Sequence, residues 1–258
     1  MAKKKNYYIL FIILIIFLII MFSLFGVKNL KAGKNKAIII IGDSSVWQYE
    51  NSNWTNLTFK SSLQQLSWKK YNIYSNRNKL GNYYLWYNDK WYAFDKNKDS
   101  VDISDDMFAY SANFDLNIKN FEVQNTDIDD YISYVLESND ISSFDDFSSI
   151  YKFKIDVNGD NVDEDFYLIS NAFSFNSDPA KTFSIAFMVK DNNIYYIYKD
   201  ISDNKYFNGC KPFYNFFFDI NSDGVLELVL SCSKFSDGGQ TDMLYTYDDN
   251  GYKISFSN

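Results

Sequence analysis

From residue 37 onward, the chain alternates apolar and aromatic runs with short polar turns. Four stretches place Asn, Asp, Lys or Gly between two aromatic runs, an arrangement typical of β-hairpins. Their turns are expected at residues 50–53, 88–90, 191–193 and 248–251. The run Ala37–Ile41 is of the buried-strand type. The pattern therefore predicts a mainly β protein of antiparallel meanders and hairpins, arranged as a propeller or as a sandwich.

One segment breaks this pattern and predicts a short helix near residues 127–138. Four apolar side chains recur there at helical spacing: Tyr131, Ile132, Val135 and Leu136. Thr126 and Asp129 have the spacing of a capping box ahead of them. The helix is expected to end an N-terminal β region at 37–139 and to lead into a C-terminal β region at 140–258.

The start of the chain is far more apolar than the rest, because residues 7–27 include no charged side chain. As a helix this run is about 31 Å long and matches a hydrocarbon core of about 30 Å. We expect a cytoplasmic tail at 1–6, a transmembrane helix at 7–27 and a tether at 28–36. The length of the apolar run favours an uncleaved anchor over a signal peptide. Although Lys residues flank both ends, the short tail places the N-terminus inside and the domain outside the cell membrane.

Charge and composition exclude several functions. The net charge is −8. Residues 1–36 carry seven Lys and no acid, so the remainder of the chain has 18 basic residues and 33 acidic ones. Such a domain repels phosphates, which excludes nucleic acid as a partner. The chain has no His, the commonest general base and the usual ligand of transition metals. The metals that remain are hard cations bound by oxygen.

Two acidic turns repeat one arrangement: "DVNGDNVDE" at 156–164 and "DINSDGVLE" at 219–227. Oxygen donors stand at positions 1, 3, 5, 7 (backbone carbonyl) and 9: Asp156, Asn158, Asp160, Val162 and Glu164, then Asp219, Asn221, Asp223, Val225 and Glu227. Alternate side chains of a curled loop converge, and Ca²⁺ takes six to eight oxygens. Position 6, Asn161 or Gly224, suits a left-handed backbone. We therefore predict structural Ca²⁺ here. The alternative is that Asp and Asn are present only because they favour turns.

The two turns resemble the calcium loops of FG-GAP/VCBS-type repeats, which occur in propellers like those of integrin α-chains. In that family an Asp-x-Asx-x-Asp-Gly-x-x-acid turn links two strands of a blade. The resemblance covers about residues 150–258 and implies calcium-binding blades. Asn161 departs from the Gly of the pattern, and residues 37–150 contain no such loop. An EF-hand is excluded because position 12 is Tyr167 or Leu230 rather than an acid, and the flanks read as strands.

The two cysteines, Cys210 and Cys232, lie on either side of the second acidic turn. A hairpin centred near residues 221–222 would place them almost opposite one another, within reach of a disulfide after a modest adjustment. The alternative is a pair of buried thiols. A disulfide would indicate an oxidising compartment.

These features predict a single-pass, membrane-anchored extracytoplasmic domain that is stabilised by calcium and acts as a binding, adhesion or structural module, not as an enzyme. A cell-wall, glycan or protein ligand is expected. Four side chains are candidates for ligand contact, unless they fill the core: Trp47, Trp54, Trp86 and Trp91. One alternative is an accessory or regulatory subunit of a membrane or cell-wall complex. Another is a carboxylate-dependent hydrolase, but no two of the 33 acids stand out as a pair.

Overall fold

The computed structural model describes residues 36–42, 45–75, 77–101, 107–112, 116–141, 149–174, 181–203, 210–234, 239–248 and 250–257. The expected tail, the expected transmembrane helix at 7–27 and the tether, apart from Lys36, lie outside these residues. No helix within the described ranges is long and apolar enough to cross a membrane.

The N-terminal half forms one antiparallel sheet of eight strands, sheet A. Its strands in spatial order are β3 (Asn53–Asn56), β2 (Ser45–Glu50), β1 (Lys36–Ile41), β8 (Phe108–Ser111), β4 (Lys69–Ser75), β5 (Asn78–Asn88), β6 (Lys90–Phe94) and β7 (Ser100–Val101). A short helix, α2 (Lys60–Gln65), packs Leu63 against one face of this sheet. The sequence pattern does not predict α2, because Leu63 is its only buried side chain and one residue shows no period.

The C-terminal half forms two five-stranded antiparallel sheets of the same topology. Sheet C contains β10 (Gln124–Asn125), β11 (Ser149–Ile155), β12 (Glu164–Ser174), β13 (Lys181–Lys190) and β14 (Asn193–Ser202), in that spatial order. Sheet B contains β9 (Asn117–Lys119), β15 (Cys210–Asp219), β16 (Glu227–Lys234), β17 (Gln240–Asp248) and β18 (Gly251–Ser257). Each is a four-stranded meander with one short strand added beside its first strand. The two similar acidic turns thus belong to two similar sheets.

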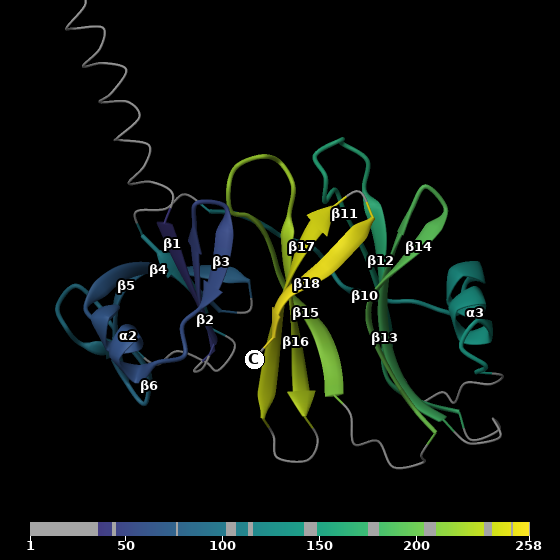
Figure 1. Ribbon diagram of the computed structural model, residues 1–258, viewed down its shortest axis with the longest axis horizontal. Helices are drawn as coiled ribbons and strands as arrows, with labels where there is room; N and C mark the ends of the chain where they lie inside the picture. The colour runs from purple at the N-terminus through teal and green to yellow at the C-terminus, as the bar shows by residue number, and fades with distance from the viewer. Residues whose placement is uncertain are drawn as a thin grey trace, which may run out of the picture.

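The three sheets lie in a row, with sheet B in the middle (Figure 1). Neighbouring side chains of β15 face the two outer sheets. The ring centroid of Phe217 lies 5.2 Å from that of Phe166 in sheet C, whereas that of Phe216 lies 4.3 Å from that of Phe108 in sheet A. Because both faces of β15 are buried, its sequence is an almost continuous apolar run instead of an alternating one. The three described sheets therefore pack face to face in a row.

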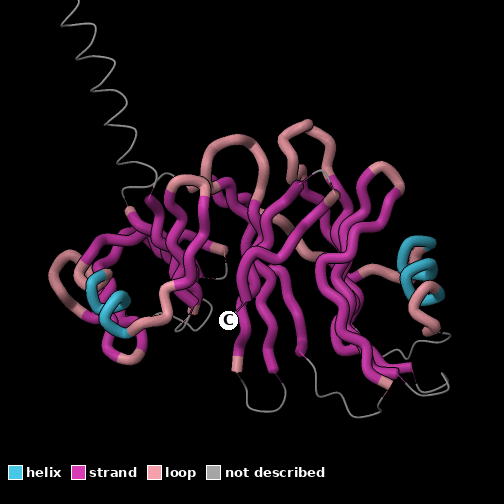
Figure 2. The backbone as a smooth tube through the Cα atoms, viewed as in Figure 1, coloured by secondary structure: helices cyan, strands magenta, loops and turns pink. Residues whose placement is uncertain are grey.

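The two helices lie at opposite ends of this stack (Figure 2). Helix α3 (Asp130–Glu137) falls within the predicted range and buries Ile132 and Val135 on the outer face of sheet C. The predicted capping box is not what begins it. Asp129 is itself the N-cap, and its Oδ1 accepts the N–H of Ile132 at 3.0 Å, while the hydroxyl of Thr126 lies near the carbonyl of Asp127 instead. A single carboxylate thus satisfies a free backbone donor at the helix start.

All four predicted hairpins are present, as β2–β3, β5–β6, β13–β14 and β17–β18. Five turn residues in the first three have left-handed backbones with φ between 51° and 63°: Asn51, Ser52, Asp89, Asp191 and Asn192. Four of the five are Asn or Asp, the residues that tolerate this conformation best after Gly. The prediction of these turns from residue type is confirmed.

The predicted disulfide between Cys210 and Cys232 is present, with the two Cα atoms 5.4 Å apart. The expected register is wrong, however, because Cys232 lies opposite Pro212 and the cysteines are diagonal neighbours. The ladder closes at Phe218 and Glu227, so the turn is centred later than expected, and a bulge in β15 shifts the register again. A diagonal pair still meets the Cα spacing that a disulfide needs.

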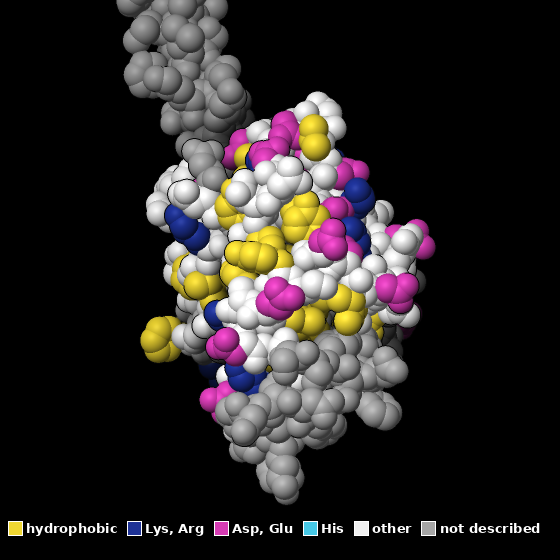
Figure 3. All heavy atoms as spheres, turned by 90° about the vertical axis from the view of Figure 1, so that its right-hand side faces the viewer, with side chains coloured by type: hydrophobic (Ala, Val, Ile, Leu, Met, Phe, Trp, Pro, Cys, Tyr) yellow, Lys and Arg dark blue, Asp and Glu magenta, His cyan; other side chains and the backbone are white. Residues whose placement is uncertain are grey.

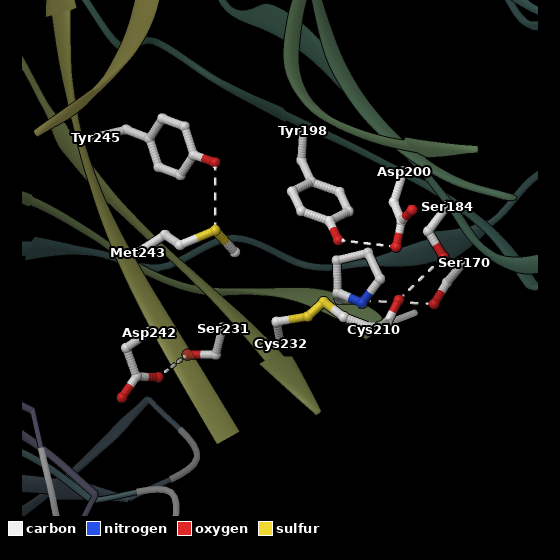
Figure 4. The surroundings of a disulfide bond; sticks show 11 residues. Ser170, Ser184, Tyr198, Asp200, Cys210, Ser231, Cys232, Asp242, Met243 and Tyr245 are labelled. Atoms are coloured by element: carbon white, nitrogen blue, oxygen red, sulfur yellow. Dashed lines mark hydrogen bonds between the residues drawn. A yellow bond between two sulfur atoms is a disulfide. The ribbon is translucent and has the colours of Figure 1, made fainter. Parts of the chain in front are cut away.

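The disulfide lies where β15 crosses the strands of sheet C (Figure 4). The Ser184 hydroxyl donates to the carbonyl oxygen of Cys210 at 3.2 Å, and the Ser170 hydroxyl donates to that of Pro212 at 3.4 Å. Both serines are buried in sheet C. The hydroxyls therefore satisfy carbonyl groups of β15 that the crossing would otherwise leave buried without a partner.

In addition to their shared hydrophobic core, sheets A and B are linked by hydrogen bonds to the buried carboxylate of Asp242 in β17. Its Oδ2 accepts the hydroxyl of Ser45 in β2 at 2.6 Å, and its Oδ1 accepts the hydroxyl of Ser231 in β16 at 2.6 Å. The amide of Gln240 donates to the same Oδ1 at 2.7 Å. Three donors from two sheets thus converge on a group that is costly to bury unpaired.

Candidate metal site in two paired loops

Loop 1 (residues 156–164) connects β11 to β12, and loop 2 (residues 219–227) connects β15 to β16. Both lie along the upper edge of the stack in Figure 1. In each loop the Asp at position 1 accepts three backbone N–H groups. Asp156 accepts those of Asn158, Gly159 and Asn161, and Asp219 accepts those of Ser222, Asp223 and Gly224. The first acid therefore sets the curl of each loop.

The side chains at positions 3 and 5 meet in both loops at the same distances. The side-chain amide of Asn158 donates to Oδ2 of Asp160 at 2.8 Å, and Asn221 donates to Asp223 at 2.8 Å. The position-5 N–H returns a bond of 3.1 Å to the position-3 amide oxygen in each loop. The side chains at positions 3 and 5 thus meet through hydrogen bonds within the loop, with the amide nitrogen rather than its oxygen turned toward the carboxylate.

Two residues of each loop, not one, have a left-handed backbone. Gly159 and Asn161 have φ values of 75° and 67°, and Ser222 and Gly224 have values of 61° and 87°. The sequence analysis anticipated position 6 but not position 4. Each loop contains one Gly, at position 4 in loop 1 and at position 6 in loop 2. The two loops therefore share one curl but have Gly at different positions of it. Asn161 in loop 1 and Ser222 in loop 2 adopt the second left-handed conformation.

The two loops touch. A Cβ atom on Gly159 would lie 3.1 Å from the carbonyl oxygen of Gly224. Alongside this contact, the N–H of Leu226 donates to the carbonyl oxygen of Val157 at 2.8 Å. This pairing is not predictable from the residues of either loop, because loops 63 residues apart meet only through the packing of two sheets.

The Glu at position 9 closes each loop from inside. Oε2 of Glu164 accepts the N–H of Val157 at 3.0 Å, and Oε2 of Glu227 accepts the N–H of Ile220 at 3.1 Å. Both carboxylates are buried. The acid predicted to complete a cation site thus binds a backbone donor at position 2 of its own loop.

The two buried Glu residues differ in their charged neighbours. Glu164 lies 3.8 Å from the ammonium of Lys190, whereas no ion pair joins Glu227 to a described Lys or Arg. Burial first, and then the negative charges of Asp219 and Asp223, raise the pKa of Glu227 to about 8, although the hydrogen bond from the Ile220 N–H opposes this shift. Burial also raises the pKa of Glu164, which its hydrogen bond from the Val157 N–H and the charge of Lys190 oppose. Loop 2 is therefore the loop that lacks positive charge.

The residue types of both loops fit a hard cation, and their arrangement defines what binding would require. Within the described ranges no three Asp, Glu or Cys side chains gather closely enough to hold a metal by themselves. The amide oxygens of Asn158 and Asn221, backbone carbonyls and water would have to complete the shell. The hydrogen bonds from the Asn158 amide and the Val162 N–H lower the pKa of Asp160, so this carboxylate stays ionised.

The four candidate Trp residues are not brought together as a ligand surface. Trp47 and Trp91 are buried in the core of sheet A, so their part is packing. Trp54 is half-buried, with its ring centroid 6.3 Å from that of Phe218 in sheet B. Trp86 alone lies on the outward face of β5, within an aromatic cluster that includes the exposed Trp68. Two of the four thus follow the alternative that they fill the core.

Comparison of the chain with protein-family models, with curated proteins and with solved structures finds no match.

Proposed function

We propose that this chain is a calcium-stabilised binding module, displayed on the outer face of a cell membrane and held there by residues 7–27. It binds a partner and catalyses no reaction. The observation that carries the proposal is Glu227, a buried carboxylate beside Asp219 and Asp223 with no positive partner among the described residues. A divalent cation would supply the missing charge. Asp219, Asn221, Asp223 and the Val225 carbonyl would hold it, with Glu227 behind them.

Three further features support the proposal. The matched curl of loop 1 and loop 2 agrees with their interpretation as FG-GAP/VCBS-type calcium loops. The disulfide Cys210–Cys232 is typical of proteins outside the reducing cytosol, where calcium is also abundant. The absence of His from the chain removes the side chain most used for acid–base catalysis. Loop 1 is expected to bind calcium more weakly, because Lys190 already lies near Glu164.

Thermal unfolding of the full chain in detergent, with calcium and with chelator, tests the proposal. Calcium at about 1 mM against an assumed dissociation constant of about 0.1 mM would stabilise by roughly 1.4 kcal/mol per site. The melting temperature should rise by a few degrees. Identical curves with calcium and with chelator would remove the metal from the proposal.

Matched variants sharpen this experiment. Asp223→Asn should abolish most of the calcium-dependent rise, and Asp160→Asn, at the same position of loop 1, should abolish less of it. Asp99→Asn is the control, because this exposed acid lies between β6 and β7 of sheet A and belongs to neither loop. A calcium response that is reduced equally by all three variants would indicate non-specific binding to a negatively charged surface.

A further inference from the structure

A groove that the sequence analysis did not anticipate runs between α3 and β14, with a volume of about 690 Å³. Its walls hold three tyrosines among polar side chains: Tyr131, Tyr134 and Tyr196, with Asp130, Ser138, Asn139, Asn192, Asn193 and Lys199. Tyr134 is 61% exposed and Tyr196 is 40% exposed. Aromatic rings that remain this open on a groove wall, beside amide and carboxylate groups, are typical of binding sites.

An acidic hollow of about 240 Å³ adjoins the groove and shares Tyr131 and Asn192 with it. The hydroxyl of Tyr131 donates to Oδ1 of Asn192 at 2.9 Å and so marks the boundary between the two. The hollow is lined by five acids and one base: Asp160, Asp163, Glu164, Asp165, Asp191 and Lys190. Figure 3 shows this face of the molecule, where hydrophobic side chains are bordered by acidic ones.

Three of the carboxylates along this face have no charge partner. No ion pair joins Asp130, Asp163 or Asp191 to a Lys or Arg of the described residues, and all three are exposed. Asp165, by contrast, lies 3.4 Å from the ammonium of Lys152. The face therefore presents uncompensated negative charge beside open tyrosine rings, and both attract cationic side chains.

The groove is held in shape at both ends of α3. At the N-terminal end, Oδ2 of the N-cap Asp129 accepts the hydroxyl of the buried Tyr167 at 2.7 Å. At the C-terminal end, the amide of Asn139 donates to the Tyr196 hydroxyl at 3.3 Å, and the Lys199 ammonium donates to Oδ1 of Asn139 at 3.2 Å. These bonds fix the two ends of α3 relative to β12 and β14, so the groove is formed before any ligand enters.

The strand along the groove has a free edge within the part of the chain that the structure describes. β14 pairs with β13 and with no other described strand. Four β14 residues line the groove and none of β13 does: Asn193, Ile194, Tyr196 and Lys199. An extended peptide that lies beside such a strand gains backbone hydrogen bonds, and neighbouring side-chain contacts select its sequence.

We propose that the groove and the acidic hollow together bind an extended peptide segment rich in Lys or Arg, supplied by another protein. The tyrosine rings contact its side-chain stems and cationic heads, and Asp130, Asp163 and Asp191 pair with its charges. This assignment rests on the proposed function as a binding module, but not on calcium. Lys199 lies in the groove wall, with its ammonium over the Tyr196 ring at 5.3 Å, and is the groove's one basic side chain.

Fluorescence anisotropy of a labelled eight-residue Lys-Thr repeat peptide, added to the full chain in detergent, tests the assignment. A Glu-Thr repeat peptide of the same length is the matched negative control. The Lys peptide should bind, the Glu peptide should not, and higher salt should weaken binding because exposed charges are screened. Equal binding of both peptides, or binding of neither, would overturn the proposal.

Variants locate the binding. Tyr134→Ser should weaken binding of the Lys peptide about tenfold, as loss of an interface aromatic does. The triple variant D130N, D163N and D191N should weaken this binding by at least as much. Tyr84→Ser is the control, since Tyr84 is 38% exposed on the distant sheet A. Equal losses in all variants would overturn the site. A neutral oligosaccharide that displaces the peptide only when Tyr134 is intact would overturn the cationic peptide as the occupant of the groove.

The same titrations with calcium and with chelator separate this inference from the proposed metal. Binding that persists in chelator, in a protein whose melting does not respond to calcium, would remove the metal and leave the peptide site. A normal calcium response with no peptide binding would leave the metal and overturn the site.

Discussion

Gly159 and Gly224 face one another across the contact between the two acidic loops, and a Cβ on Gly159 would lie 3.1 Å from the Gly224 carbonyl oxygen. The reverse is not true, because a Cβ on Gly224 would meet nothing closer than the Gly159 Cα at 4.0 Å. Two residues with similar left-handed backbones thus have different freedom. Because the two loops are in contact, a substitution in one loop can alter the conformation of the other.

Gly159→Ala should destabilise the protein more than Gly224→Ala. Each substitution places Ala in a left-handed backbone, at a cost of about 1 kcal/mol. Only the first also pushes a methyl group against backbone of the other loop, which should raise its total to about 2–3 kcal/mol. Urea unfolding of the two variants measures the difference. Equal losses would show that the loops separate freely.

Glu227 should make stability fall as pH rises. Its pKa is raised from 4.5 to about 8 by burial and by nearby Asp carboxylates. The unfolded chain releases this proton near pH 4.5 and the folded chain near pH 8. The stabilisation by the protonated form is therefore complete below pH 4.5 and is lost between these values, at about 1.4 kcal/mol for each unit of raised pKa.

Unfolding of the wild type and of Glu227→Gln in chelator, at pH 5 and at pH 9, measures this effect. The wild type should lose stability relative to the variant at the higher pH, because Gln cannot ionise. Glu164→Gln is the matched control, since Lys190 opposes the raised pKa of Glu164. A constant difference between wild type and E227Q across this range would contradict the raised pKa. Calcium, if it binds, should reduce the loss at pH 9.

Asp242→Ala should be among the most destabilising substitutions in the protein. It leaves the buried hydroxyls of Ser45 and Ser231 without their acceptor, and it removes the polar link between sheets A and B. The expected loss is about 3 kcal/mol. Asp127→Ala, an exposed loop acid, should change stability by less than about 0.5 kcal/mol. Similar urea midpoints for the two variants would show that the carboxylate is not structural.

Replacing Cys210 and Cys232 together by Ser should cost about 3 kcal/mol, because the disulfide closes a loop of about 23 residues in the unfolded chain. Reductant should lower the melting temperature of the wild type and leave that of the double variant unchanged. Ser184 and Ser170 keep their bonds to β15 in the variant, so the strand crossing itself should survive. A wild-type melting temperature that does not change with reductant would mean that the disulfide contributes little to stability.

Local residue chemistry determined much of this structure in advance. The four hairpin turns follow from Asn, Asp and Gly, since few other residues adopt the backbone that a tight turn needs. Helix α3 follows from its apolar period, and the curl of loop 2 follows from Asp219, which accepts three backbone N–H groups of its own loop. Each of these signals lies within about a dozen residues of chain, which is the distance over which backbone preference acts.

Tertiary packing decided the rest. The contact of Gly159 with Gly224, the stacking of three sheets and the groove beside Tyr134 all join segments far apart in sequence. Trp47 and Trp91 became core residues because both faces of sheet A are covered, one by sheet B and the other by α2, which residue type alone does not reveal. The register of Cys232 depended on a bulge, and one inserted residue shifts every partner beyond it. Local residue types set the positions of the four hairpin turns, whereas the packing of the sheets set which loops come into contact.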